Sequence, residues 1–140
     1  MDESTLKRTL PYSIEAEQCV IGSMIMDGDA ITIATEILTK DDFYQKQYAV
    51  LFDAMEQMNN AGEAVDPITL QNKLNSMNAA PEIARLDYLG DIVTMVPLSV
   101  RIRDYARIVK DKSLLRQIIR VNENIENECY EGKNSVDSIL

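Results

Sequence analysis

The sequence predicts an all-α protein with a compact helical-bundle head and one long helix that projects from it. Aliphatic residues and seven methionines dominate over aromatic residues, and tryptophan is absent. The four prolines and five glycines fall between segments whose apolar residues have helical spacing. One segment, residues 99–130, continues for more than thirty residues without glycine or proline.

Helix-capping residues mark the first two predicted helices. Ser13 is the expected N-cap of a helix over residues 14–26, with Glu15 and Glu17 in its first turn, where the helix dipole favours acidic side chains. Gly22 lies in its middle, and we favour a close crossing by another helix there over a poor helix former that packing tolerates. Asp29 is expected to cap the next helix, over residues 30–38.

The third predicted helix covers residues 45–60 and carries an amphipathic run. Thr39 and Asp42 form a cap-like pattern ahead of it. Phe43 and Tyr44 are expected to anchor its start in the core.

Two further helices complete the predicted head. Asp66 as N-cap, followed by proline, indicates a helix over residues 67–77. Another is expected to begin near Glu82 and to place leucine, isoleucine and valine side chains on one face through Val96. Tyr88 falls beside that face.

The long helix is expected to start with Ser99 as N-cap and to end at Gly132. At about 1.5 Å per residue it spans roughly 45 Å, which exceeds the width of a small domain. Its apolar face changes direction by about 150° near residues 110–113. The first face consists of Ile102, Tyr105, Ala106 and Val109, and the second of Leu114, Ile118, Val121, Ile125 and Cys129.

Two apolar faces indicate that the long helix has two partners. The first face is expected to pack on the rest of this chain, and the second on a returning helix or on another molecule. The alternative is a curved core helix with one wide apolar face. The resulting division is a disordered tail over residues 1–9, a head over 10–98, and the long helix with the start of a return over 99–140.

Composition restricts the class of protein. No apolar run could cross a membrane and no signal peptide opens the chain, so a cytoplasmic location is expected. Cys19 and Cys129 lie among apolar helical positions, which indicates reduced core thiols and not a disulfide or metal site.

The net charge of −9 is unevenly distributed. Half of the fourteen basic residues lie between Arg101 and Arg120, and residues 99–120 carry a net charge of +5. Such a basic stripe could bind nucleic acid. It could equally be a solvated helix face or pair with acidic neighbours in an assembly.

Candidate catalytic groups are lacking. Histidine is absent, and no glycine-rich phosphate loop occurs. Helix capping accounts for the carboxylate pairs Asp41–Asp42 and Asp27–Asp29. The chain by itself therefore indicates an interaction module and not an enzyme, with no catalytic, cofactor or metal site.

Several segments, in order and spacing, resemble the N-terminal domain of the bacterial replicative DNA helicase of the DnaB type. The resemblance covers nearly the whole chain from Leu10. The matching segments are Leu10–Pro11, Ser13–Gln18, Val20–Met24, Asp42–Tyr44, Leu51–Met55, Gly62, Val65–Asp66, Tyr88–Leu89, Val96–Pro97, Tyr105–Val109 and Leu115–Arg116.

The resemblance implies a collar domain of a hexameric helicase. In this family the long helix is the first leg of a helical hairpin, and residues 135–140 would start the second leg, cut short here. Hairpins pair, three pairs form the collar, and the collar docks the C-terminal domain of primase. The ATP-dependent motor, with ATP and Mg²⁺, would lie outside this chain. A helicase loader is a possible partner, and direct DNA contact by this chain is not expected.

The resemblance also implies site residues. Primase docking falls on Glu15, Tyr88, Ile119 and Ile125, and self-association on the second apolar face, which is Leu114, Ile118, Val121, Ile125 and Cys129. Their structural interpretations are helix-dipole stabilisation for Glu15, packing for Tyr88 and a plain hairpin core for the isoleucines. The alternative function is a free-standing helical regulator that binds nucleic acid through the basic stripe Arg101–Arg120.

Overall fold

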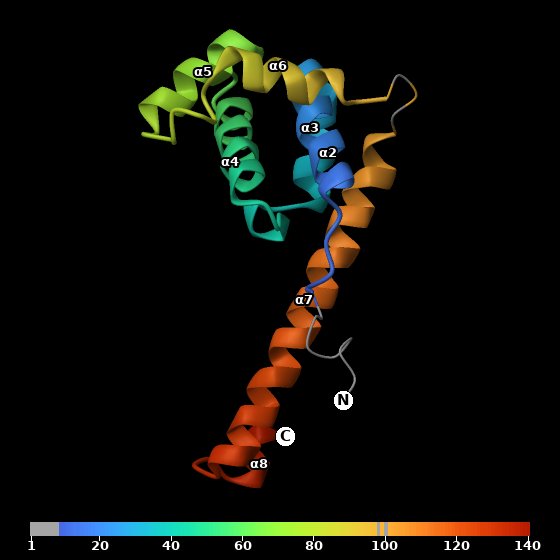
Figure 1. Cartoon of the computed structure of the whole chain (residues 1–140), viewed down its shortest axis with the longest axis vertical. Coiled ribbons are helices and arrows are strands. Elements are labelled where there is room, and N and C mark those ends of the chain that lie inside the picture. The colour runs from blue at the N-terminus through green and yellow to red at the C-terminus, as the bar shows by residue number, and fades with distance from the viewer. Residues whose placement is uncertain (1–8, 98, 100) are drawn as a thin grey trace.

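A computed structural model describes residues 9–97, 99 and 101–140 (Figure 1). Over these residues it contains seven α-helices, one short 3-10 helix and no strand, which confirms the all-α class. The elements are α2 (Ile14–Met26), α3 (Gly28–Ile37), η1 (Lys40–Asp42), α4 (Lys46–Asn60), α5 (Pro67–Ser76), α6 (Leu86–Thr94), α7 (Ile102–Glu131) and α8 (Val136–Ile139). Except for Thr9, the predicted disordered tail lies outside the described residues.

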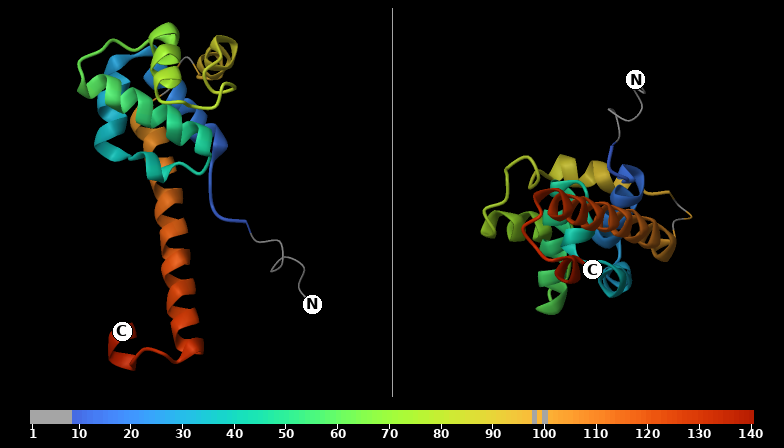
Figure 2. Two further views of the ribbon diagram at one scale, coloured as in Figure 1. Left: turned by 90° about the vertical axis from the view of Figure 1, so that its left-hand side faces the viewer. Right: turned by 90° about the horizontal axis from the view of Figure 1, so that it is seen from below.

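Helix α2 is the centre of the head, with α3, α4, α6 and α7 packed around it. It is apolar on most of its circumference, as expected for a helix enclosed by neighbours. Figures 1 and 2 show α2–α6 gathered into the head, while the second half of α7 extends away from it. The fully buried side chains of the core include Ile21, Met24, Leu51, Phe52, Met55, Leu70, Leu74 and Leu89.

Gly22 lies where α6 and the residues after it cross α2. A Cβ atom on Gly22 would lie 2.3 Å from Cγ2 of Val96 and 2.9 Å from the carbonyl oxygen of Ile92. Only glycine leaves room for this approach. The predicted close crossing is therefore confirmed.

The N-caps of three helices in the head are formed by polar side chains. Ser13 Oγ accepts a hydrogen bond from the Ala16 N–H at 3.2 Å, as predicted. Asp66 Oδ1 likewise accepts the N–H groups of residues 68 and 69 at the start of α5. The predicted cap Asp29 is wrong, because Asp27 Oδ1 accepts the Asp29 N–H at 2.9 Å and Asp29 already lies inside α3.

Two predicted helix starts lie later in the structure. Helix α6 begins at Leu86, because residues 80–84 form an isolated turn and Arg85 is extended. Helix α7 begins at Ile102 with Arg101 at the N-cap position, so Ser99 is not its cap. At the other end Gly132 adopts a left-handed φ of 64° and its N–H bonds to the Glu128 carbonyl, as predicted.

The first half of α7 packs against α2 and α3. Ala106 and Val109 are buried there, and Ile102 and Tyr105 are half-buried against the core. This confirms the predicted role of the first apolar face. None of the described helices is both long and apolar enough to cross a membrane.

Candidate functional site

Helix α7 changes its surroundings at Arg116. Ser113 and Arg116 are its last buried residues, and none of residues 117–140, all of which the structure describes, is buried. In Figure 1 this half of α7 runs downward from the head, with α8 beside its far end. Within residues 9–97, 99 and 101–140, nothing buries the second apolar face, which argues against a curved core helix with one wide apolar face.

A buried polar cluster forms the joint between the head and α7. We call it the polar joint; it consists of Asp42, Lys110, Ser113 and Arg116. The Asp42 carboxylate, 2% exposed as a residue, accepts a hydrogen bond from Ser113 Oγ at 2.7 Å. Its Oδ1 lies 3.3 Å from Lys110 Nζ, and its Oδ2 accepts the Thr39 N–H at 2.8 Å.

Arg116 connects α7 to the N-terminal segment and to η1 through buried hydrogen bonds. It is 4% exposed, and its guanidinium donates to the carbonyl oxygens of Asp42 at 2.7 Å and Pro11 at 2.9 Å. The same guanidinium lies 5.6 Å from the ring centroid of Tyr44. Tyr44 in turn stacks on Tyr12 with ring centroids 4.3 Å apart. Phe43 is buried as predicted, whereas Tyr44 is 40% exposed beside the polar joint, so its predicted role as a core anchor is wrong.

Glu17 supports the same region from α2. Its carboxylate accepts the N–H groups of Tyr44 at 3.0 Å and Gln45 at 3.1 Å, just before α4. Burial raises the pKa of Glu17, while the two backbone hydrogen bonds and nearby Arg116 act in the opposite direction. Sequence reasoning assigned Glu17 to the helix dipole only. No sequence signal identified it as buried, because its partners are 27 and 28 residues away.

The apolar stripe lies on the projecting half of α7. We use this name for Leu114, Ile118, Val121 and Ile125, which are 43%, 63%, 57% and 43% exposed. Together with Gln117 and Asn122 they line one shallow groove. Cys129, the fifth residue of this predicted face, is free and exposed, so the prediction of a core thiol holds for buried Cys19 and is wrong for Cys129.

The four residues predicted to dock primase lie in two regions of the molecule. Glu15 is exposed in the first turn of α2, and Tyr88 is half-buried on α6 in a hollow that Gln47 also lines. Burial raises the pKa of the Tyr88 hydroxyl. Ile119, half-buried in a groove with Leu10, and Ile125 both lie on the projecting half of α7. The fold of one chain does not gather the four residues into one patch.

The basic stripe is partly used inside the fold. Lys110 and Arg116 belong to the polar joint, whereas Arg101, Arg103, Arg107 and Arg120 are exposed. Two of the seven basic side chains of this stripe are therefore engaged within the fold, and nucleic-acid binding by the others stays a hypothesis.

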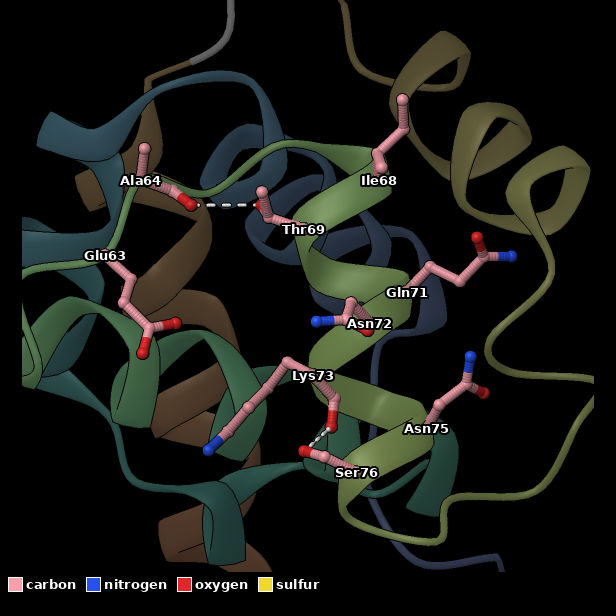
Figure 3. A pocket seen from close by; sticks show the side chains of 9 residues that line it. All are labelled: Glu63, Ala64, Ile68, Thr69, Gln71, Asn72, Lys73, Asn75 and Ser76. Atoms are coloured by element: carbon pink, nitrogen blue, oxygen red, sulfur yellow. Dashed lines mark hydrogen bonds between the residues drawn. The ribbon is translucent and has the colours of Figure 1, made fainter.

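One surface hollow lies over α5 and is lined mainly by polar side chains. Figure 3 shows its polar side chains, with the Thr69 hydroxyl bonded to the Ala64 carbonyl and the Ser76 hydroxyl to the Lys73 carbonyl. Both hydroxyls thus bond to the backbone. Among the described residues, no group of three or more histidine, cysteine or carboxylate side chains is arranged to hold a metal ion.

Comparison with known proteins gives one consistent result. The family described as "DnaB-like helicase N terminal domain" matches residues 9–111. Replicative DNA helicase DnaC of Bacillus subtilis is 36% identical over 133 residues, which cover 95% of this chain and 29% of the relative. Replicative DNA helicase DnaB of Geobacillus stearothermophilus is 36% identical over 140 residues, 100% of this chain and 31% of the relative. The chain thus spans about three tenths of these relatives.

Two solved structures share the fold. The N-terminal domain of DnaB helicase from Mycobacterium tuberculosis superposes with a TM-score of 0.86 at 29% identity, covering 92% of both chains. The corresponding domain from Helicobacter pylori, described with its interactions with primase, gives a TM-score of 0.71 at 17% identity. That match covers 83% of this chain and 90% of the other, and at this identity it shows the fold alone.

Proposed function

Because the chain belongs to the family of DnaB-like helicase N-terminal domains, we propose that it is the assembly and docking domain of a replicative DNA helicase. It pairs with a second copy through the apolar stripe and holds primase through a second set of residues, which shares Ile125 with the stripe. Three such pairs form the collar of a hexamer. ATP and Mg²⁺ belong to the remaining part of the helicase, since the chain spans only about three tenths of its relatives.

The observation that carries the pairing proposal is the exposure of the apolar stripe. Its residues are spaced four, three and four positions apart, which is the spacing of a two-helix seam. All four are at least 43% exposed, on a helix half that no other element of the head covers. A contiguous apolar surface of this kind marks a protein interface more often than a solvated face.

In this proposal the head and the projecting helix have different roles. The head, residues 10–98, supplies a folded body, and residues 99–140 supply the pairing helix and the start of its return. Cys129, one turn beyond Ile125, would extend the pairing surface.

Primase docking rests on the family and on the positions of Glu15, Tyr88, Ile119 and Ile125. The H. pylori relative is described with interactions with primase. Because the four residues lie in two regions, we propose that the C-terminal domain of primase contacts the head and the projecting helix at once, or bridges two paired copies. A helicase loader could use the same exposed surfaces.

Pairing is tested by sedimentation velocity of Ile118→Asp and of Ile68→Asp as control. Both isoleucines are exposed, at 63% and 69%, but Ile68 lies on α5 in the head. We expect a concentration-dependent dimer for the native chain and for Ile68→Asp, and a monomer for Ile118→Asp, because a carboxylate in the seam has no partner. Equal dimerisation of both variants would exclude the stripe as the interface.

Docking is tested by calorimetric titration with the cognate primase C-terminal domain. Tyr88→Ala and Ile119→Asp should each raise the dissociation constant at least tenfold. A tenfold change corresponds to a loss of about 1.4 kcal/mol of binding free energy, which is usual for an important interface residue. Ile68→Asp should leave it unchanged. If steeply salt-dependent binding to duplex DNA were found instead, the nucleic-acid regulator would be favoured.

A further inference from the structure

A small hollow lies in the head where the end of α2, the start of α3 and the start of α7 meet. In Figure 1 these elements adjoin on the right-hand side of the head. We call it the Ser23 hollow, and its volume is about 220 Å³. Ser23 and Asp27 are its polar lining residues. Its apolar lining residues are Met26, Ala30, Val96, Pro97 and Ile102.

The hydroxyl group of Ser23 is the unusual feature of this hollow. Ser23 is 6% exposed, and its Oγ has no hydrogen-bond partner among the described residues. In that part of the chain, no other buried side-chain nitrogen or oxygen atom lacks a partner. A buried hydroxyl without a hydrogen bond is unfavourable. A bound molecule that offers Ser23 a partner would therefore gain affinity that a purely apolar cavity cannot give.

Close packing holds most of the walls of the Ser23 hollow. Val96 lies against α2 at Gly22, where a Cβ atom would come within 2.3 Å of Val96 Cγ2. Ala30 is 6% exposed, and Ile102 is half-buried against the core. Both α3 and α7 pack on α2 and so position these two side chains. Walls built from packed helices favour a preformed site.

Asp27 restricts the charge of a ligand in this hollow. As the N-cap of α3, its Oδ1 accepts the Asp29 N–H at 2.9 Å. The carboxylate can accept a further hydrogen bond, because each of its oxygen atoms carries two lone pairs. Its negative charge repels anions. The polar groups of the hollow therefore suit a neutral ligand that can both donate and accept a hydrogen bond.

From these observations we infer that the Ser23 hollow binds a neutral molecule of about the size of one aromatic ring that carries a hydroxyl group, with phenol as the simplest example. An apolar cavity of about 150 Å³ holds benzene, so about 220 Å³ accommodates a substituted ring. The ring packs on the apolar lining, and its hydroxyl group bonds to Ser23 or Asp27. Water alone fits less well, because the apolar lining offers it few hydrogen-bond partners.

This site is separate from the surfaces of the proposed function. No residue assigned to self-association or to primase docking lines it. A bound molecule would touch Pro97 and Ile102, which flank the connection from α6 into α7. The Ser23 hollow would thus add a ligand-dependent contact at the base of the long helix.

Phenol and toluene test the inference, because a hydroxyl group in one replaces a methyl group in the other. Titration of the ¹⁵N-labelled native chain should give saturable amide shifts at Ser23, Ala30 and Ile102. We expect a dissociation constant of about 1 mM for phenol and one at least fivefold higher for toluene, which leaves Ser23 unpaired. Benzoate should not bind, because Asp27 repels it. No saturable shift with phenol up to about 20 mM, or equal affinities for phenol and toluene, would overturn the inference.

Ser23→Ala separates the contribution of the hydroxyl group from that of the apolar walls. It should raise the dissociation constant of phenol about fivefold and leave that of toluene unchanged. Ser76→Ala is the matched control, because the Ser76 hydroxyl bonds to the Lys73 carbonyl in the hollow over α5, and it should change neither constant. Ile118→Asp should bind phenol as the native chain does, so this test is independent of pairing. Unchanged phenol binding by Ser23→Ala would overturn the proposed ligand class.

Discussion

The two halves of α7 belong to one continuous helix but occupy different environments. Before Arg116, Ala106 and Val109 are buried where α7 packs on α2 and α3, and the polar joint holds the helix against η1 and the N-terminal segment. Beyond Arg116, residues of the same chemical type are exposed. Burial on α7 is therefore decided by what lies beside each turn and not by hydrophobicity alone.

The residues at the boundary are polar where a simple core would be apolar. Apolar packing tolerates small rotations, whereas hydrogen bonds to Asp42 and to two backbone carbonyls require defined directions. The polar joint thus sets the direction in which α7 leaves the head. The following substitutions compare the two sides of this boundary.

The largest effect is expected at Arg116. Arg116→Met would leave the carbonyl oxygens of Pro11 and Asp42 without their donor in a buried site, and should lower the free energy of unfolding by about 3 kcal/mol. Arg120→Met, one turn further along and exposed, should change it by less than about 0.5 kcal/mol. Urea denaturation measures both. Equal losses would mean that the boundary does not lie at Arg116.

Two valines on α7 give a matched pair with a smaller effect. Val109 is 1% exposed against the head and Val121 is 57% exposed in the apolar stripe. Val109→Ala should cost about 2 kcal/mol of stability, because a buried cavity results. Val121→Ala should cost less than about 0.5 kcal/mol in the monomer, measured by urea denaturation at a concentration below the dimer dissociation constant. The reverse order would contradict the division of α7.

Carboxylates on the two sides of the boundary should differ in their effect on pH dependence. Glu17 in the head is buried, whereas Glu123 on the projecting half is exposed. Glu17→Gln keeps one acceptor for the two N–H groups of Tyr44 and Gln45, and should cost about 1 kcal/mol at neutral pH. Glu123→Gln should change the stability by less than about 0.5 kcal/mol.

The sign of the pH effect follows from the raised pKa of Glu17. Between the ordinary value of 4.5 and the raised folded value, the folded state binds more protons than the unfolded state. The contribution of Glu17 to stability is therefore lost as pH rises through this interval. Chemical denaturation across this pH range should show that the free energy of unfolding falls less with rising pH for Glu17→Gln than for the native chain. Parallel curves would contradict the raised pKa of this carboxylate.

Much of the secondary structure, and the division of α7 into two halves, could be predicted from local sequence patterns. Neighbouring residues suffice to predict local features. These are the helical spacing of apolar residues, the N-caps Ser13 and Asp66, and the left-handed Gly132. The change of apolar face near residues 110–113 is also local, since it depends only on periodicity. The predicted starts of α6 and α7 are wrong, because Arg85 and Arg101 are extended and each helix begins only after that residue.

Which polar residues are buried depends on contacts between segments that are distant in the sequence. Arg116 looked like one member of a basic stripe and Glu17 like a helix-dipole acid, yet both are enclosed. Arg116 bonds to Pro11, which lies 105 residues away in the sequence. Arg116 and Glu17 can be buried because distant segments supply their hydrogen-bond partners. The periodicity within one helix does not predict these contacts. The apolar stripe, in contrast, follows from helical spacing within one segment and could be predicted from the sequence directly.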